Sequence, residues 1–115
     1  MYIWIIVEFI MVEWILEQTT DFEKEFDKLI PKNLQERVKK QILKLKENPF
    51  VGKPLGVRFF REKKFDKWRV YFLIYEEKII VYFVGISNKK LQQHKIDLLR
   101  ELFKPFKEEI ENKFI

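Results

Sequence analysis

The chain has 115 residues, enough for one domain with a single core and too few for two lobes. It has no cysteine and one histidine, His94, which excludes disulfides, thiolate zinc sites, cysteine nucleophiles and histidine-cluster metal centres. We therefore expect neither a metal nor another cofactor. Lys and Arg number 23 against 18 Asp and Glu, and this net charge of +5 is compatible with a nucleic acid or an acidic protein as partner.

Residues 1–16 form an apolar run that is interrupted by Glu8 and Glu13. A membrane-spanning helix needs about 20 apolar residues and a signal peptide begins with positive charge, so we predict no membrane association. The β-branched and aromatic residues from Met11 to Glu17 predict a first strand, and Met11 could itself be the natural start. Residues 1–10 are then an N-terminal arm or an over-long start, ahead of a single domain over residues 11–115.

A helical hairpin is predicted next. Thr20 and Glu23 have the spacing of a capping box, and Pro31 separates the first helix from a second that ends at Asn48-Pro49. Each helix carries one apolar stripe at helical spacing. The stripes consist of Phe22, Phe26 and Leu29 in the first helix and of Leu34, Val38, Ile42 and Leu45 in the second.

From Val57 the period changes to two, which predicts strands at Val57–Lys63, Trp68–Tyr75 and Ile79–Ile86. Short connections favour an antiparallel meander. The tail from Lys89 to Lys113 is predicted to be helical, with a bend or break at Pro105. The fold class is therefore α+β, a four-stranded sheet of order β-α-α-β-β-β packed on a helical hairpin. Its other face is left to the C-terminal helix, a ligand or a partner.

Basic residues concentrate in two segments that a meander could bring together into a cationic cleft. Such a cleft suits phosphate contacts, because each Lys or Arg neutralises backbone charge and releases counterions. The alternative is that these residues form solvated turns that guard the sheet edges. The first segment holds Arg58, Arg61, Lys63, Lys64, Lys67 and Arg69, and the second holds Lys89, Lys90, His94 and Lys95.

Arg69 interrupts an apolar strand, where an unpaired charge is costly. It is either a functional cation on the same strand face as Tyr71 or a structural ion-pair residue. The candidate partners for such a pair are Glu62, Asp66 and Glu76. In the functional interpretation Arg69 is an unpaired cation beside Arg61 and Lys63, and its removal leaves the fold intact. His94 is the one side chain that ordinarily titrates near neutral pH, and it is the candidate for proton transfer.

Three segments together resemble the RelE/ParE superfamily of type II toxins, particularly archaeal RelE-like members. They are LKLKENPFVGKPLG (residues 43–56), RFFREKKFDKWRVYFLIYEEKIIVYFVGIS (58–87) and NKKLQQHKID (88–97). The resemblance covers roughly residues 12 to 100 and implies a compact β-α-α-β-β-β fold. In this superfamily RelE members cleave mRNA in the ribosomal A site and ParE members poison gyrase. Each is neutralised by a cognate antitoxin that wraps the toxin.

The resemblance also implies site residues. The arginine within the third strand corresponds to Arg69, and the basic residues of the preceding strand to Arg61 and Lys63, with Arg58 as competitor. The basic residue after the last strand falls at Lys89. The C-terminal tyrosine of RelE members has no clean match, because Lys95 stands there with His94 beside it. The catalytic candidates are thus Arg61, Lys63, Arg69, Lys89 and His94, and the RNA-binding candidates are Arg58, Lys64, Lys67, Lys90 and Lys95.

Two hypotheses about function follow from the resemblance. The first is a cytoplasmic toxin that acts as a metal-free endoribonuclease on mRNA at the ribosome. In this hypothesis a ribose 2′-OH attacks the adjacent phosphate, and arginines and lysines stabilise the developing charge. The second is a binding module without catalysis, either a ParE-like gyrase inhibitor or a degenerate toxin fold. Both hypotheses include a cognate antitoxin as partner.

Overall fold

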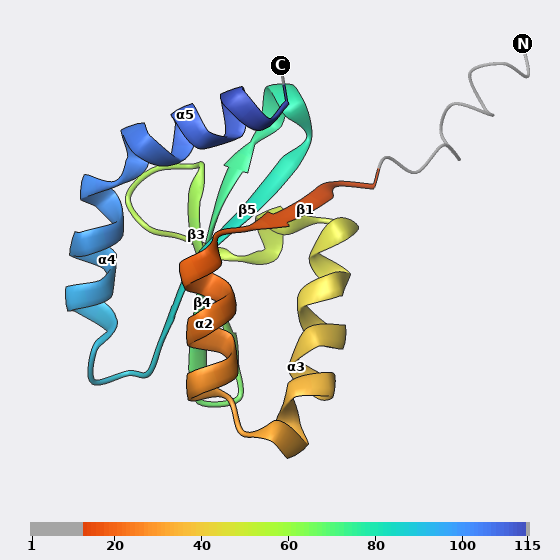
Figure 1. Cartoon of the computed structure of the whole chain (residues 1–115), viewed down its shortest axis with the longest axis vertical. Coiled ribbons are helices and arrows are strands. Elements are labelled where there is room, and N and C mark those ends of the chain that lie inside the picture. The colour runs from red at the N-terminus through yellow and green to blue at the C-terminus, as the bar shows by residue number, and fades with distance from the viewer. Residues whose placement is uncertain (1–12, 115) are drawn as a thin grey trace, which may run out of the picture.

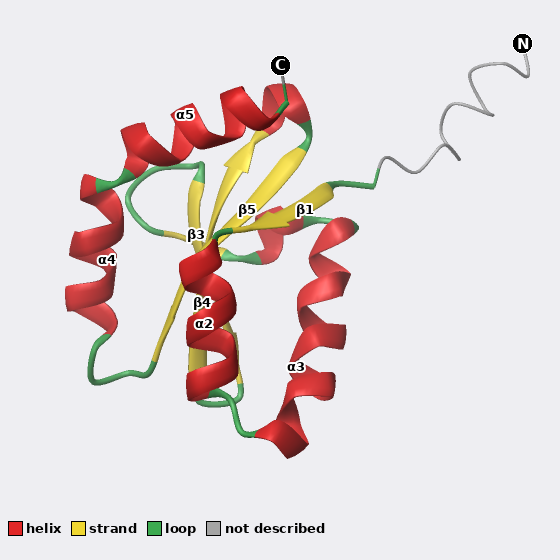
Figure 2. Ribbon diagram, viewed as in Figure 1, coloured by secondary structure: helices red, strands yellow, loops and turns green. Residues whose placement is uncertain are grey.

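The computed structural model describes residues 13–114 as a central sheet between two helical layers (Figures 1 and 2). Residues 1–12, with the predicted arm or over-long start, lie outside the described residues. The strands are β1 (Ile15–Gln18), β2 (Lys53–Pro54), β3 (Phe60–Phe65), β4 (Trp68–Tyr75) and β5 (Ile80–Ser87). The helices are α2 (Thr20–Leu29), α3 (Lys32–Leu43), α4 (Gln92–Glu101) and α5 (Phe103–Lys113), and the 3-10 turns are η1 (Lys44–Lys46), η2 (Pro49–Val51) and η3 (Glu76–Lys78).

The sheet has five strands in the order β1-β5-β4-β3-β2. β1 lies parallel to β5, and every other pair is antiparallel, which confirms the α+β class and the meander. The predicted count of four strands is wrong, because Lys53 and Pro54 pair with Glu62 and Arg61 as a short edge strand. β3 begins at Phe60 rather than at the predicted Val57, because residues 56–59 form a turn. Gly56 has a φ of 84° in this turn, and the Leu55 N–H donates to the Phe60 carbonyl across it.

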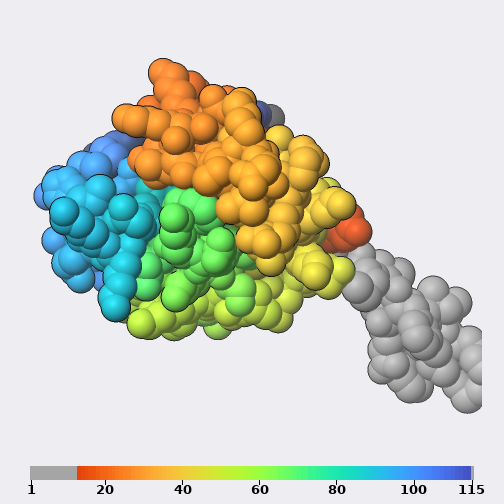
Figure 3. Space-filling view, turned by 90° about the horizontal axis from the view of Figure 1, so that it is seen from below, coloured from red at the N-terminus to blue at the C-terminus, as the bar shows by residue number. Residues whose placement is uncertain are grey.

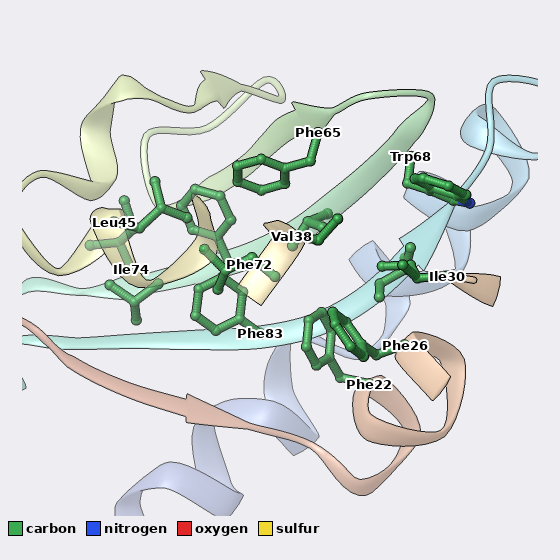
Figure 4. Close-up of a cluster of buried hydrophobic side chains, with 14 residues drawn as sticks. Phe22, Phe26, Ile30, Val38, Leu45, Phe65, Trp68, Phe72, Ile74 and Phe83 are labelled. Atoms are coloured by element: carbon green, nitrogen blue, oxygen red, sulfur yellow. The ribbon is translucent and has the colours of Figure 1, made fainter. Parts of the chain in front are cut away.

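Helices α2 and α3 cover one face of the sheet and enclose an aromatic cluster (Figure 4). Phe22 and Phe26 of α2 are buried against Phe83 of β5, and Val38 of α3 is fully buried. The predicted capping residue is off by one position. The side chain of Thr19, not Thr20, accepts the Phe22 N–H at 3.0 Å and caps α2.

Helices α4 and α5 cover the opposite face, so of the three occupants predicted for it the chain's own C-terminal segment is the one present. Ile96 and Leu99 of α4 and Phe106 and Ile110 of α5 are buried there against the sheet. The predicted tail helix is two helices that meet at Leu102. Pro105 lies in the first turn of α5, where a missing backbone N–H removes no helical hydrogen bond.

Candidate functional site

The strand register brings three polar residues side by side on the face that α4 covers. Lys64 of β3 pairs with Arg69 of β4, and Arg69 pairs with Ser87 of β5. In the next row toward the sheet centre, Glu62 pairs with Tyr71. Cross-strand partners point to the same side of a sheet, so these five side chains form one polar region at the hairpin end of the molecule. We call this region, with Gln92, Lys89 and Lys90, the Arg69 site.

Glu62 connects Arg69 to α4. The Arg69 Nε lies 3.1 Å from Glu62 Oε1, and the amide nitrogen of Gln92 donates to both Glu62 oxygens at 3.1 and 2.9 Å. The side chains of Arg69 and Glu62 are only 12% and 7% exposed. The Arg69 Nε–H is not aligned for a hydrogen bond, so charge attraction rather than a hydrogen bond holds the contact. Arg69 is predicted from the sequence to be either an unpaired functional cation or a structural ion-pair residue. The ion pair with Glu62 is present, so the prediction of an unpaired cation is wrong.

The terminal nitrogens of Arg69 make no hydrogen bond or ion pair with any residue from 13 to 114. They are also not among the fully buried unpaired atoms of that part of the chain, so they keep some contact with solvent although the side chain as a whole is only 12% exposed. An arginine that is held at Nε and keeps two unpaired outer nitrogens partly open to solvent can offer the planar fork that binds phosphate in a bidentate manner.

A hydrogen-bond chain beneath Arg69 holds the end of β5. Ser87 Oγ donates to the Asn88 carbonyl at 3.0 Å, so its single proton is used, and the Tyr71 hydroxyl must donate to Ser87 Oγ at 2.8 Å. Burial raises the pKa of Tyr71, although the bond to Ser87 opposes the rise. Tyr71 is therefore a protonated donor at neutral pH and not a base. The Asn88 side chain accepts the Leu91 N–H at 3.0 Å and directs the chain into α4.

Lysines surround the solvent side of the Arg69 site. Lys64, Lys89 and Lys90 are exposed and make no ion pair with any described residue. Lys89 and Lys90 follow Ser87, the direct partner of Arg69, so the turn from β5 to α4 leaves the sheet beside the arginine. Lys67, at the tip of the β3–β4 hairpin, lies 5.2 Å from the Trp68 ring centre. The predicted grouping of the hairpin with Lys89 and Lys90 is confirmed in position.

Arg61 and Lys63 do not join Arg69, which corrects the predicted cleft. Arg61 pairs with Phe72 and Lys63 with Val70, so both lie on the α2–α3 face of the sheet. Arg61 is 7% exposed. Its guanidinium donates to the carbonyls of Arg58, Phe50 and Gly52 at 2.9, 3.0 and 2.7 Å. Burial, the largest cause, and neighbouring Arg58 lower the pKa of Arg61. Its contacts are those of a structural residue that fastens the η2 loop to β3.

Three further candidates lie away from the Arg69 site. Arg58 pairs with Glu76 at 2.7 Å near the opposite end of β4. Lys95 forms an ion pair with Glu25 of α2, and the same carboxylate accepts the Ile86 N–H at 3.2 Å beyond the end of β1. His94 is exposed, and two residues along a helix from Gln92 it projects about 200° away from the sheet-facing side. The prediction that His94 transfers a proton in the cleft does not agree with this position.

Glu62 and Gln92 are central to the site, and sequence reasoning did not single out Gln92 at all. A polar residue in the first turn of a predicted helix carries no local signal for a contact 30 residues away. Within residues 13–114, no group of three or more His, Asp or Glu side chains is arranged to hold a metal ion. The helices of this same part of the chain are all too short or too polar to span a bilayer.

The comparisons with known proteins agree with this architecture. A family profile described as "ParE toxin of type II toxin-antitoxin system, parDE" matches residues 16–91. No curated protein matches the sequence. The free form of a double arginine-to-alanine mutant of the E. coli toxin RelE is similar in structure, with a TM-score of 0.66 at 17% identity, over 79% of this chain and 99% of that one.

Two complexes are also similar. The toxin–antitoxin complex RelBE2 of Mycobacterium tuberculosis matches with a TM-score of 0.57 at 24% identity, over 69% of this chain and 94% of that chain. The E. coli RelE mutant in complex with an antitoxin RelBc peptide matches with a TM-score of 0.57 at 17% identity, over 72% and 94%. These likenesses show a shared fold, and the profile match covers more than half of the sequence. The chain therefore belongs to the ParE toxin family of type II toxin–antitoxin systems, within the RelE/ParE superfamily that its sequence resembles.

Proposed function

We propose that this toxin binds mRNA on the ribosome at the Arg69 site and cleaves it there. The observation that supports the proposal best is the state of Arg69, which Glu62 anchors through Nε while its terminal nitrogens reach solvent. Lys64 beside it and Lys89 beyond Ser87 add positive charge. A phosphodiester bound by the arginine would thus have cations on both sides, which is the arrangement that phosphate contacts require.

The proposed reaction is an internal transfer. The ribose 2′ oxygen attacks the adjacent phosphorus, the bond from phosphorus to the 5′ oxygen breaks, and the products are a 2′,3′-cyclic phosphate and a 5′-hydroxyl. Arg69 and Lys64 stabilise the charge that develops on the phosphoryl oxygens. Glu62 positions Arg69, since both of its oxygens are already engaged by Gln92. The 2′ proton passes to solvent and the leaving 5′ oxygen takes a proton from solvent in this scheme, because His94 lies on the far side of α4.

The cognate antitoxin is proposed to be acidic, in keeping with the net charge of +5 on this chain. Solved relatives include RelE–RelB complexes, and we extend that partnership to this toxin. A ribosomal target also implies that the toxin acts in the cytoplasm. Co-expression of the toxin with the reading frames that neighbour its gene should yield a stable complex with one of them. Failure of all of them to co-purify would contradict a toxin–antitoxin pair.

The proposed activity is tested by primer extension on an mRNA in a translating extract. The toxin should produce cuts spaced by codons, which naked mRNA does not show. The variant Lys64→Gln with Lys89→Gln should reduce cleavage by about 10²-fold, because it removes two cations that make no ion pair with any residue from 13 to 114. The charge-matched control Lys78→Gln with Lys104→Gln changes exposed lysines away from the site and should cut as wild type does. Equal losses in both variants would refute the assignment of the site.

A second candidate function is inhibition of DNA gyrase without catalysis. The matching family profile is that of ParE toxins, and among the described residues no base without a partner lies beside Arg69. A supercoiling assay with purified gyrase separates the two functions. Inhibition of supercoiling together with intact mRNA in the translating extract would establish the gyrase function and exclude the nuclease.

A further inference from the structure

A polar groove runs between α3 and the outer edge of β3, on the far side of the hairpin from α4. Its volume is about 520 Å³. Figure 3 views this end of the molecule, with the hairpin residues in green between the orange-to-yellow α2 and α3 and the blue α4. The polar residues that line the groove are Gln41, Lys44, Glu47, Asn48, Lys63 and Lys64.

None of the three lysines of this groove has an acidic partner among residues 13–114, whereas some lysines elsewhere on the surface do. Lys32, Lys107 and Lys113 each lie within 4.0 Å of a carboxylate oxygen. In contrast Lys44, Lys63 and Lys64 make no ion pair with any residue from 13 to 114. Of the groove's own lining, only Glu47 is acidic, so its positive charge is largely uncompensated. Such a surface attracts a polyanion, and binding releases counterions.

Neutral donors add to the lysines. The side-chain oxygen Oδ1 of Asn48 accepts the Phe50 N–H at 3.0 Å, which leaves the side-chain amide N–H groups for another acceptor. β2 pairs only with Arg61 and Glu62, so β3 from Lys63 onward has an unpaired edge. The Phe60 carbonyl faces β2, and by alternation the backbone N–H of Lys64, four residues on, faces the groove.

The groove is continuous with the Arg69 site through Lys64. This residue lines the groove and is also the cross-strand partner of Arg69. A phosphodiester chain bound at Arg69 can therefore cross the hairpin at Lys64 and continue between Lys63 and Lys44. We propose that the groove binds the backbone of single-stranded RNA that flanks the phosphate held at Arg69, which rests on the function proposed above.

The lining favours a nucleic-acid backbone over an acidic peptide. A peptide that docks in a groove anchors itself with apolar side chains, whereas of the apolar residues here Phe65 and Leu45 are buried in the core and only Val51 is exposed. Contacts from lysines and amides to phosphates carry no base preference. The groove therefore extends the length of RNA that is bound without selecting its sequence.

The test measures binding of two 2′-O-methyl oligoribonucleotides, which cannot be cleaved, by fluorescence anisotropy. One is a trinucleotide that fits Arg69 alone, and the other has about ten nucleotides, within the range of known single-strand sites. In the variant Lys44→Gln with Lys63→Gln, the longer probe should bind about tenfold more weakly, and its log–log salt slope should fall by about 1.4, or 0.7 per lost contact. The trinucleotide should bind as it does to wild type. Lys44→Gln alone changes only an exposed side chain and should give about half of this loss in slope.

The control Lys78→Gln with Lys104→Gln removes the same charge and should bind both probes normally. An unchanged affinity for the longer probe in the groove variants, or an equal loss in the control, would overturn the proposal. Groove variants that bind RNA as wild type does but no longer bind the antitoxin would also overturn the proposal.

Failure of the proposed function gives a different result. If the toxin does not cleave mRNA but the longer probe still binds through the groove lysines, the groove proposal stands and the nuclease proposal fails. If the affinity for the longer probe depends on Lys44 but the trinucleotide does not bind even to the wild type, then the Arg69 site is excluded and the groove is not.

Discussion

Arg69 on β4 and Glu62 on β3 form a buried ion pair, with 3.1 Å between Nε and Oε1, and Gln92 of α4 completes the coordination of the carboxylate. The pair lies diagonally across two strands, since Glu62 is directly opposite Tyr71. It connects the sheet to the helix that covers it. The same arginine thus contributes both to the stability of the fold and to the proposed phosphate contact, and the two roles can be separated by experiment.

Arg69→Ala should lower the free energy of unfolding by about 3 kcal/mol, because it leaves the buried Glu62 carboxylate without its counter-charge. Adding Glu62→Met to this variant should restore part of the loss, since the unpaired charge is then removed. Chemical denaturation of the two variants measures both values. An Arg69→Ala protein as stable as wild type would show that the pair contributes nothing and that Arg69 acts only on substrate.

Arg61→Met should destabilise the protein by about 2–4 kcal/mol, because three backbone carbonyls lose their donor in a buried position. RNA affinity of the folded fraction should not change. Arg58→Met is the matched control, since Arg58 stacks on the same Phe50 ring but is exposed, and its loss should cost less than about 1 kcal/mol. A folded Arg61→Met protein that no longer binds RNA would return Arg61 to the functional site.

Three tyrosines should make the fold sensitive to alkali, of which Tyr71 and Tyr82 are buried and Tyr75 is partly buried. Burial raises the pKa of Tyr71, Tyr75 and Tyr82, and a hydrogen bond to Glu109 raises that of Tyr82 further. Their neutral forms are favoured in the folded state, so this stability is complete below the ordinary tyrosine pKa of 10.0 and is lost as the pH rises above it.

Denaturation followed at increasing pH should show this loss, and tyrosinate absorbance should appear together with unfolding. Tyr82→Phe should make the pH dependence shallower. Tyrosinate that forms at its ordinary pH in a protein that stays folded would contradict the prediction.

Thr19→Ala should lower stability by about 1 kcal/mol, because the Thr19 hydroxyl accepts the Phe22 N–H at the start of α2. Thr20→Ala is the neighbouring control and should change stability by less than about 0.5 kcal/mol, since Thr20 is exposed and caps nothing. Thermal unfolding of both variants decides between the two positions. A larger effect at Thr20 would support the capping box that the sequence pattern predicts.

Local sequence patterns were sufficient to predict the main helices and strands and the buried face of the first two helices. The run Trp68–Tyr75 predicts β4 with both ends correct, because a short run of aromatic and aliphatic residues between charged turns favours a strand without help from distant residues. The stripes on α2 and α3 likewise identify their buried sides, except that Leu29 is exposed and Ile30, beyond the end of α2, is buried instead. The same alternation places Arg69 and Tyr71 on a common face, and the structure confirms this.

The composition of the site was decided by tertiary structure. Alternation divides β3 into two sets, one with Arg61 and Lys63 and the other with Glu62 and Lys64, but it does not say which set faces α4. That choice depends on the register across the hairpin, where Asp66, with φ of 56°, and Lys67 form the turn, and Phe65 pairs with Trp68. A shift of one residue would exchange the two sets, because side chains alternate with a period of two. The register therefore gave Arg69 the partner Glu62 and turned Arg61 toward the backbone carbonyls of the opposite face.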